Sequence, residues 1–467
     1  MRGTGGAADT PDRAVPVPVR VSAGDDGTVL ITPAAAADPP GPDFTYADPR
    51  GPDFTHAVLD VAGAVLAWPV LGGPVPPTAY VHDAGRAQQW LWALYGERVA
   101  LAVHERALGR TAADRTALAD VAARLGLGHW AARWWPASYT DGIPALEPDV
   151  LGVELAALTH RCQQLFDDGG DQPDDRAAEL IEDHRAALAP LIQWWHATAH
   201  HPAHTARHLE TVLTLVDAAA DGAGLDGPAL RHLRTALGER HPAGAPAGPG
   251  APVDLGALFA RHDGYALAAG APTATGGRVI ARGAGANDWR RYPHGYVDAA
   301  EDAVSWTARA LGARRRIEVE VVAHRAAPAA TGTLLVADVR VHGGHRGRVP
   351  LARRDDLWAG HADVDLDAEP PTGPGPAGVE VGVLLPGFDP GAASAHAADD
   401  RAARDAVRAL ARQRLATAAQ PFPYGEAQSF PYDAAQSFPY GEAPHTAVST
   451  PFLAETAATA TAADEDY

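Results

Sequence analysis

The sequence has one cysteine, Cys162, and no lysine in 467 residues. A single cysteine cannot form a disulfide within the chain or supply a cysteine-based zinc finger. The 38 basic residues are all arginine. Schiff-base enzymes, Walker A nucleotide sites and Ser-x-x-Lys acyl enzymes each need a lysine, so the sequence excludes all three classes.

Long apolar runs are also missing. No stretch reaches the roughly 18 apolar residues that a membrane helix needs, and residues 1–20 contain no apolar run typical of a secretory signal. The formal net charge is -20 at pH 7, which disfavours binding to nucleic acid or to anionic membranes. We therefore expect an acidic, soluble, cytoplasmic protein with neither type of partner.

What the chain does contain is enough apolar sequence for two or three domains, since 46% of residues are hydrophobic. We predict an α+β protein: an N-terminal helical bundle domain, a smaller domain with an antiparallel β-sheet or sandwich, and a disordered C-terminal tail. The predicted segments are a loosely ordered arm with a possible hairpin (1–56), a mainly helical domain (57–240), a Pro/Gly linker (241–252), the α+β domain (253–390), a helix (391–418) and the acidic tail (419–467).

Local patterns support these assignments. Asp25-Asp26-Gly27 between two β-branched runs predicts a hairpin. Apolar spacing typical of helices recurs between residues 84 and 216, and Val297–Leu311 is also predicted to be a helix because Gly312 follows it. Consecutive short β-branched segments from Ile317 to Leu385 favour an antiparallel sheet.

The tail carries a Phe-Pro-Tyr unit three times at intervals of eight residues. Proline lowers the ordering cost on binding, and the two aromatic rings supply a large contact area on a small footprint. Three copies would add avidity through effective concentration. The nine residues predicted to bind a partner are Phe422, Pro423, Tyr424, Phe430, Pro431, Tyr432, Phe438, Pro439 and Tyr440.

We therefore favour a non-catalytic interaction or accessory protein, whose tail is bound by a partner protein or processed by a modifying enzyme. The spacing resembles the repeated cores of enzyme-modified precursor peptides, which would make the tail a substrate. The alternative explanation is repeat expansion without a binding role.

Histidines give a second candidate. His196, His200, His204 and His208 follow one another at i,i+4 spacing, which can present two imidazoles on one helix face to a divalent transition metal. A metal-dependent enzyme using residues 196–208 is therefore the alternative function. No catalytic residue is assigned, because neither an H-E-x-x-H motif nor a Gly-x-Ser-x-Gly elbow occurs.

Two further hypotheses remain. A small-molecule sensor would place its pocket at the domain junction. The candidates to hold the acidic tail are the arginines of the segment Asp288–Pro293 and of the run Arg314–Arg316, or those at 401, 404, 408 and 412 along one side of the predicted helix 399–416.

Overall fold

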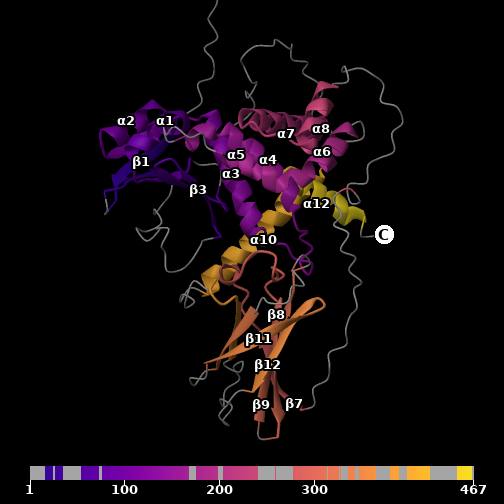
Figure 1. Ribbon diagram of the computed structural model, residues 1–467. Coiled ribbons are helices and arrows are strands. Elements are labelled where there is room, and N and C mark those ends of the chain that lie inside the picture. The colour runs from indigo at the N-terminus through magenta and orange to yellow at the C-terminus, as the bar shows by residue number, and fades with distance from the viewer. Residues whose placement is uncertain are drawn as a thin grey trace, which may run out of the picture.

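The computed structural model describes the chain in separate stretches. These are residues 16–24, 27–34, 54–72, 76–167, 175–197, 203–239, 258, 277–312, 314–324, 327, 335–341, 346–363, 379–388, 397–420 and 450–464. Within them the chain begins with strands, continues with helices, returns to strands and ends with two helices (Figure 1).

The first sheet has six strands in the order β3-β4-β5-β2-β1-β6, and each neighbouring pair is antiparallel. Val19, Val21 and Ile31 are buried on β1 and β2, so alternate residues of these strands face the core. The strands are β1 (Val17–Ala23), β2 (Val29–Pro33), β3 (His56–Val61), β4 (Ala64–Pro69), β5 (Thr78–Val81) and β6 (Gly109–Ala113). The paired β1 and β2 confirm the predicted hairpin.

Helices cover this sheet and extend away from it. Asp83 caps α1 by accepting hydrogen bonds from the amides of Gly85 and Arg86, and Thr116 caps α3 in the same way. The helices are α1 (Ala84–Tyr95), α2 (Glu97–His104), α3 (Ala117–Trp134), α4 (Pro148–Arg161), α5 (Arg176–His184), α6 (Leu188–His196), α7 (Ala203–Gly222) and α8 (Pro228–Gly238). Helix α4 is central, because it contacts α3, α5 and α7.

The second sheet has seven strands in the order β13-β10-β11-β12-β9-β8-β7, again antiparallel throughout. It curls into a half-barrel, because Ala286, which follows β7, pairs with Gly382 on β13 at the opposite end of the strand order. The strands are β7 (Arg278–Ala284), β8 (Val304–Leu311), β9 (Arg314–Val322), β10 (Leu335–Val341), β11 (Arg346–Arg354), β12 (Leu357–Asp363) and β13 (Val379–Leu384).

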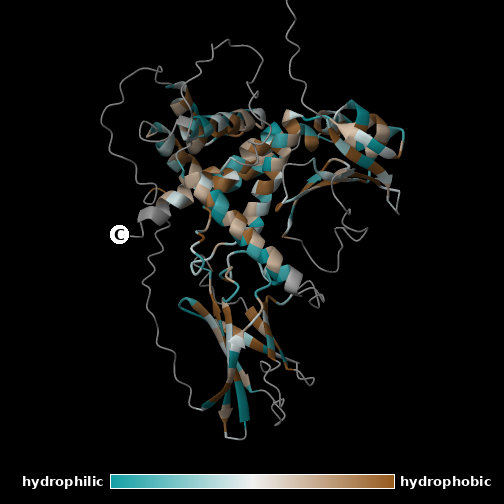
Figure 2. Cartoon of the chain, turned by 180° about the vertical axis from the view of Figure 1, so that it is seen from behind, coloured by the Kyte–Doolittle hydropathy of each residue, from teal (hydrophilic) through white to brown (hydrophobic). Residues whose placement is uncertain are grey.

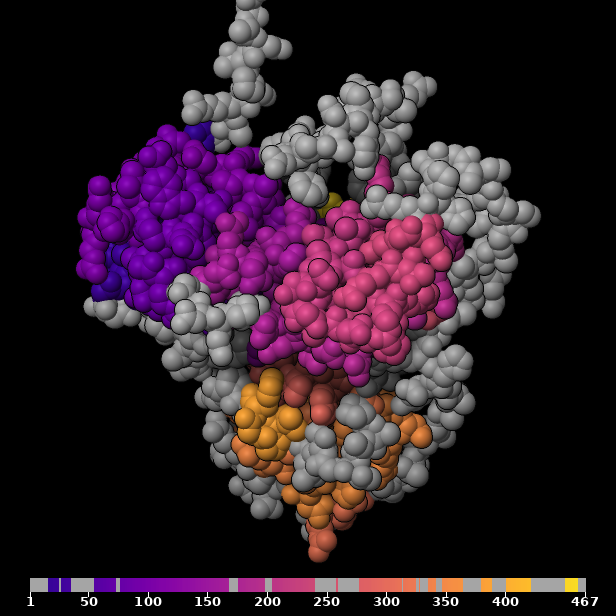
Figure 3. Space-filling model, turned by 45° about the horizontal axis from the view of Figure 1, so that its top comes forward, coloured from indigo at the N-terminus to yellow at the C-terminus, as the bar shows by residue number. Residues whose placement is uncertain are grey.

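Two helices complete the described chain, α10 (Ala397–Ala419) and α12 (Leu453–Asp464). Helix α10 runs diagonally from the half-barrel to the helical region, where it packs beside α12 (Figure 1). Seen from behind, it crosses the junction between the two regions (Figure 2). In the space-filling view the helical region and the half-barrel meet closely, and α7 and α8 lie on the near face (Figure 3).

The predicted fold class is wrong in its order and in its N-terminal domain. Strands come first, and the segment 57–240 that was predicted to be helical contributes β3, β4, β5 and β6 to a sheet. A strand also replaces the helix predicted over Val297–Leu311. Val304, Trp306 and Ala308 are buried while Ser305 is exposed, a two-residue period that belongs to β8. The antiparallel sheet predicted within 253–390 is confirmed.

Part of the predicted tail is folded as well. Phe452, Leu453 and Ala454 are buried at the start of α12, so residues 450–464 belong to the body. In the part of the chain that the structure describes, no helix has both the length and the apolar character needed to cross a membrane.

Candidate functional site

The three Phe-Pro-Tyr units lie within residues 421–449, outside the described stretches. The structure does place both ends of this segment. Helix α10 ends at Ala419, the chain is described again from Thr450, and α10 and α12 contact each other (Figure 1). The repeats therefore connect two packed helices and are not a free tail.

Five side chains hold the returning end, and we call them the C-terminal clamp: Arg124, Glu154, Arg414, Phe452 and Glu455. Arg124 on α3 reaches the chain just before α12. Its Nη1 donates to the carbonyl of Thr450 at 2.6 Å, and its Nη2 donates to the carbonyl of Pro451 at 3.1 Å. Two residues more than 300 positions apart in sequence are thus joined directly.

Glu154 on α4 completes this half of the clamp. One carboxylate oxygen pairs with Arg124 Nη2 at 2.6 Å and lies 3.0 Å from Nε2 of His208. The other accepts a hydrogen bond from the amide of Leu453 at 2.8 Å. Because a buried carboxylate is costly unless it is paired and hydrogen-bonded, these contacts explain how Glu154 is held in the core.

The other half joins α10 to α12. Glu455 pairs with Arg414 at 2.6 Å and accepts a hydrogen bond from the amide of Phe452 at 2.7 Å, which satisfies a free donor at the start of α12. Two guanidinium groups lie over the Phe452 ring, that of Arg124 at 4.6 Å and that of Arg414 at 5.2 Å from its centre. Glu455 is fully buried, and Phe452 is nearly so.

The clamp is charged at neutral pH. Burial alone would raise the pKa of Glu154, but His208 and Arg124 outweigh that effect and hold the pKa at about 2. The return point of the repeat segment is thus fixed by ion pairs in a protein interior, where water screens them little.

Arg401, Arg404, Arg408 and Arg412 of α10 bind partners outside the predicted acidic tail. Arg401 and Arg404 bind Glu301, which precedes β8, at 2.9 and 2.8 Å. Arg412 binds Asp141 of the helical region at 3.0 Å, and Arg408 donates to the carbonyl of Ala299 at 3.0 Å. That hypothesis is wrong for these four residues, which link α10 to the half-barrel and to the loop before α4. Arg414, which sequence reasoning did not select, is the one that binds the C-terminal segment.

The predicted metal ligands are only partly placed. His196 ends α6, His204 and His208 lie on the first turns of α7, and His200 falls outside the described residues. His208 faces Glu154 and Arg124 in the clamp. Among the residues placed by the structure, no group of three or more His, Cys, Asp or Glu side chains could hold a metal ion. The four-histidine site remains a prediction.

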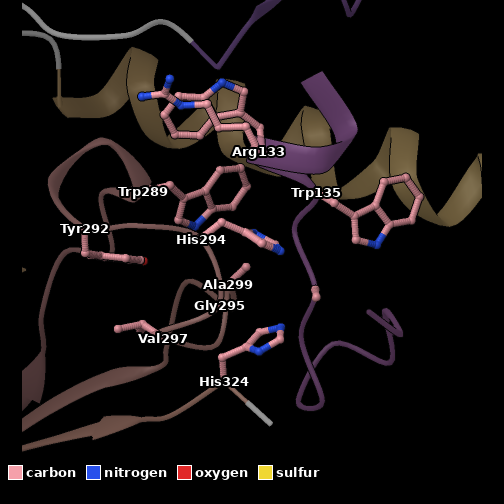
Figure 4. Close-up of a pocket in the computed structure, with 11 residues that line it drawn as sticks. Arg133, Trp135, Trp289, Tyr292, His294, Gly295, Val297, Ala299 and His324 are labelled. Carbon is pink, nitrogen blue, oxygen red and sulfur yellow. The ribbon is translucent and has the colours of Figure 1, made fainter. Parts of the chain in front are cut away.

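A pocket at the junction of the two regions is a separate candidate. It lies between the end of α3 and the loop that follows β7 (Figure 4). Its lining comprises Arg133, Trp134, Trp135, Ala137, Trp289, Tyr292, His294, Gly295, Val297, Ala299 and His324. The hollow measures about 330 Å³ with its open mouth, and about 20 Å³ of that admits the centre of a water molecule. The enclosed part thus has room for about one water-sized group.

Charges of both signs surround this junction pocket: burial is the main cause that raises the pKa of the lining residue Tyr292, and the nearby Asp288, Asp298 and Glu301 raise it further. Its lining includes no acidic residue, and Arg133 lies at the surface with its guanidinium 4.8 Å from the centre of the Trp134 ring. Burial, together with the nearby His294 and Arg353, lowers the pKa of His324 to about 4. Desolvation also lowers the pKa of His294. Both imidazoles are therefore largely uncharged at neutral pH.

Cys162 carries no such chemistry. It is buried at the end of α4, and desolvation raises the pKa of its thiol to about 12 despite the neighbouring Arg161. A thiol with that pKa stays protonated at neutral pH and is a poor nucleophile.

Sequence reasoning missed the clamp, and it placed a pocket at the domain junction only as part of the sensor hypothesis, without naming any of the residues that line it. One local signal was available for α12, because Glu455 stands three residues after Phe452 and Pro451 precedes both, a pattern typical of a helix start. Arg124 and Glu154 gave no local signal, because in the sequence each is one more charged residue on a predicted amphipathic helix. Comparison with protein-family models, curated proteins and solved structures gives no match.

Proposed function

We propose that this protein presents the three Phe-Pro-Tyr units to a partner protein or modifying enzyme, using its folded body as a support. The observation that supports this proposal most is the C-terminal clamp. It fixes residue 450 beside the end of α10, so residues 421–449 are tethered at both ends. Tethering keeps all three units near one place on the molecule, which raises the effective concentration of the second and third units once the first has bound.

The composition of the units supports recognition more than catalysis. Each unit offers two aromatic rings around a proline, and none of the nine residues can act as a nucleophile or metal ligand at neutral pH without further activation. The spacer residues are small or polar. A partner with aromatic-lined grooves would match the units, as in other modes of proline-rich recognition.

The test is a pull-down from native lysate, read by mass spectrometry, with the intact protein and a Phe422→Ala, Phe430→Ala, Phe438→Ala triple variant. A matched control changes the spacers instead, with Gln428→Ala, Gln436→Ala and Glu442→Ala. The expected result is a partner that the intact protein and the spacer variant retain and the aromatic variant loses. The intact mass of native protein, taken from the same sample, reports modification within residues 420–443. Identical partners for all three proteins and an unmodified mass would reject the proposal.

The metal hypothesis for His196, His200, His204 and His208 stands as an alternative proposal. His204 and His208 are four residues apart on α7, which is the spacing that two ligands on one helix need. Metal analysis after purification with added Zn²⁺ tests it. A molar ratio near one that falls in a His204→Ala variant would support the hypothesis, and a ratio near zero would reject it.

A further inference from the structure

Strand β7 forms an open edge of the half-barrel, at the end that lies away from the helices (Figure 1). It pairs with β8 on one side, and no strand in the described part of the chain pairs with its other side. Val279 and Ile280 are 46% and 38% exposed there. An open strand edge presents N–H and C=O groups that can pair with a further strand. The open length is short, because Ala286, just after β7, pairs with Gly382 of β13.

The charges around this edge are mainly positive. Strands β7, β8 and β9 carry six arginines and two glutamates, which leaves a formal charge of +4 in a chain whose net charge is -20. Arg278 and Arg282 are exposed, and neither has an ion pair among the residues that the structure describes. Glu318 lies two strands away from Arg282 and already pairs with Arg309 at 2.8 Å. These three strands therefore leave the two charges on β7 without a partner.

A second copy of β7 is a poor match for this edge. Twofold pairing centred on Ile280 would place Arg278 directly opposite Arg282, and like charges directly opposite each other destabilise a sheet. The register with β8 also shifts between Val279 and Ala281, so the strand is irregular at its centre. Charges and bulges of this kind keep edge strands from pairing with their own copies. The same charges attract a strand of opposite sign, so the edge discriminates between partners by charge.

We propose that β7 binds an extended acidic segment of a partner protein, which adds a strand to the half-barrel. Main-chain groups would supply the pairing, and Val279 and Ile280 would contact the centre of the segment. Arg278 and Arg282 would bind carboxylates toward its two ends. This surface is separate from the Phe-Pro-Tyr units and from the C-terminal clamp.

The probe is a fluorescently labelled peptide as long as β7, Glu-Asp-Val-Thr-Val-Asp-Glu. Arg278 and Arg282 align with Ala310 and Thr307, which lie on opposite faces of β8, and adjacent acidic residues offer a carboxylate to each face. The peptide reads the same in both directions, so parallel and antiparallel addition place its charges alike. Fluorescence anisotropy on the full chain at pH 7 and about 50 mM salt should give a Kd on the order of 100 μM, weaker at about 300 mM salt.

Two control peptides separate charge from strand pairing. Gln-Asn-Val-Thr-Val-Asn-Gln keeps the shape without the charge, and it should bind at least about fivefold more weakly. Glu-Asp-Pro-Pro-Val-Asp-Glu keeps the charge but lacks two successive N–H groups. Because successive N–H groups of a strand point to opposite sides, one of these would face β7, and this peptide should not saturate by about 2 mM.

Two double variants assign the surface. Arg278→Gln with Arg282→Gln should weaken the acidic peptide about fivefold, since each exposed charge pair contributes modestly. The matched control is Arg20→Gln with Arg110→Gln, which removes the same charge from exposed residues on β1 and on the edge strand β6 of the first sheet. That change should leave the Kd within about twofold.

Two other occupants of the edge have distinct outcomes. If a second copy fills it, sedimentation of the protein alone will show a dimer that the acidic peptide dissociates. If the acidic run after β12 fills it, Asp365→Asn with Asp367→Asn will tighten the acidic peptide several-fold. Either result would overturn the proposal of a partner segment.

Three further results would reject it: no saturable binding of the acidic peptide by about 2 mM, equal binding of the proline peptide, or equal losses in the two double variants. The control peptides are tested on the unaltered protein, so they decide the question even if a double variant does not fold. The aromatic triple variant of the repeats should bind the acidic peptide normally, so failure of one proposal would not be mistaken for failure of the other.

Discussion

Glu154 shows how strongly a single side chain can tie distant parts of this chain together. Its two oxygens contact Arg124 on α3, His208 on α7 and the first amide of α12. Glutamine would preserve the volume and could still accept a hydrogen bond from Leu453. It would leave Arg124 buried without its charged partner, which is the costly half of breaking a buried ion pair.

We therefore predict that Glu154→Gln lowers the free energy of unfolding by about 3 kcal/mol at pH 7. The pKa of Glu154 is held below its ordinary value, at about 2, so its contribution is complete above about pH 4.5 and is lost as the pH falls toward 2. The variant should lack that part of the acid dependence. Urea unfolding between pH 2 and 7 measures both effects, with the exposed Glu179→Gln as control. Parallel pH profiles for variant and wild type would contradict the assignment.

Gly152, two residues before Glu154 on α4, is a second sensitive position. A methyl group there would overlap the ring of His184, whose Nδ1 lies 3.0 Å from Asp149. We expect Gly152→Ala to destabilise the protein by about 2 kcal/mol through overpacking, although alanine is the better helix former. Gly238→Ala, at the end of α8 with open space around it, should be neutral or slightly stabilising. Equal melting temperatures for the two variants would show that α5 can move away from α4 at little cost.

At the scale of elements, the terminal helix depends on its first turn. Phe452, Leu453, Ala454 and Glu455 are all buried where the clamp acts, and Ala457 and Ala458 continue the buried face. Phe452→Ala should remove a buried ring that two guanidinium groups contact and cost about 3 kcal/mol, with α12 opening before the rest of the fold. Hydrogen exchange of the α12 amides should accelerate more than exchange in α4. The control is Phe388→Ala, which changes a phenylalanine that is 37% exposed; if it accelerated α12 equally, the clamp would not be the cause.

Elements with a strong period were the ones that sequence could predict. The helices between residues 84 and 216 carry apolar residues at helical spacing, and the strands from Ile317 onward alternate or are β-branched. Val304–Leu311 was mistaken for a helix because the glycine after it suggested a helix end and outweighed an alternating pattern. The first sheet was missed because β5 and β6 are short and pair with strands far away in sequence. Pairing between strands that are distant in sequence produces little pattern within a short stretch of residues.

The candidate site could be predicted from the sequence less well than the fold. The repeats are visible in the sequence because they are local, whereas the clamp joins positions 124, 154, 414, 452 and 455 through tertiary packing alone. The junction pocket likewise combines α3 with a loop more than 150 residues later. Nothing in the spacing of Arg133 and Trp289 predicts that they line one hollow.

Over the whole molecule, α10 joins the half-barrel to the helices, alongside direct contacts such as the hydrogen bond from the amide of Tyr139 to Asp298 at 2.7 Å. Glu301 forms ion pairs with Arg401 and Arg404 of α10, and Asp141 forms an ion pair with Arg412. Burial would raise the pKa of Glu301, but Arg404 and Arg401 reverse this and lower it, so the contact loses strength in acid as the carboxylate becomes protonated.

We predict that Glu301→Gln separates the unfolding of the two regions. The half-barrel should melt first, with a loss of about 2 kcal/mol in coupling, and differential scanning calorimetry should resolve two transitions where the wild type gives one. Glu239→Gln, a change at an exposed residue at the end of α8, is the control. A single unshifted transition in the Glu301 variant would mean that other contacts along α10 are sufficient.

From the position of the clamp we expect the covalent connection through residues 421–449 to be dispensable for assembly. A chain cut once in that interval would consist of a large fragment ending beside α10 and a short one beginning before α12, held together by the buried contacts of Arg124, Glu154 and Arg414. The two pieces would behave as a split protein that reassembles from its parts. The repeats could therefore be cleaved by a processing enzyme while the folded body kept its shape.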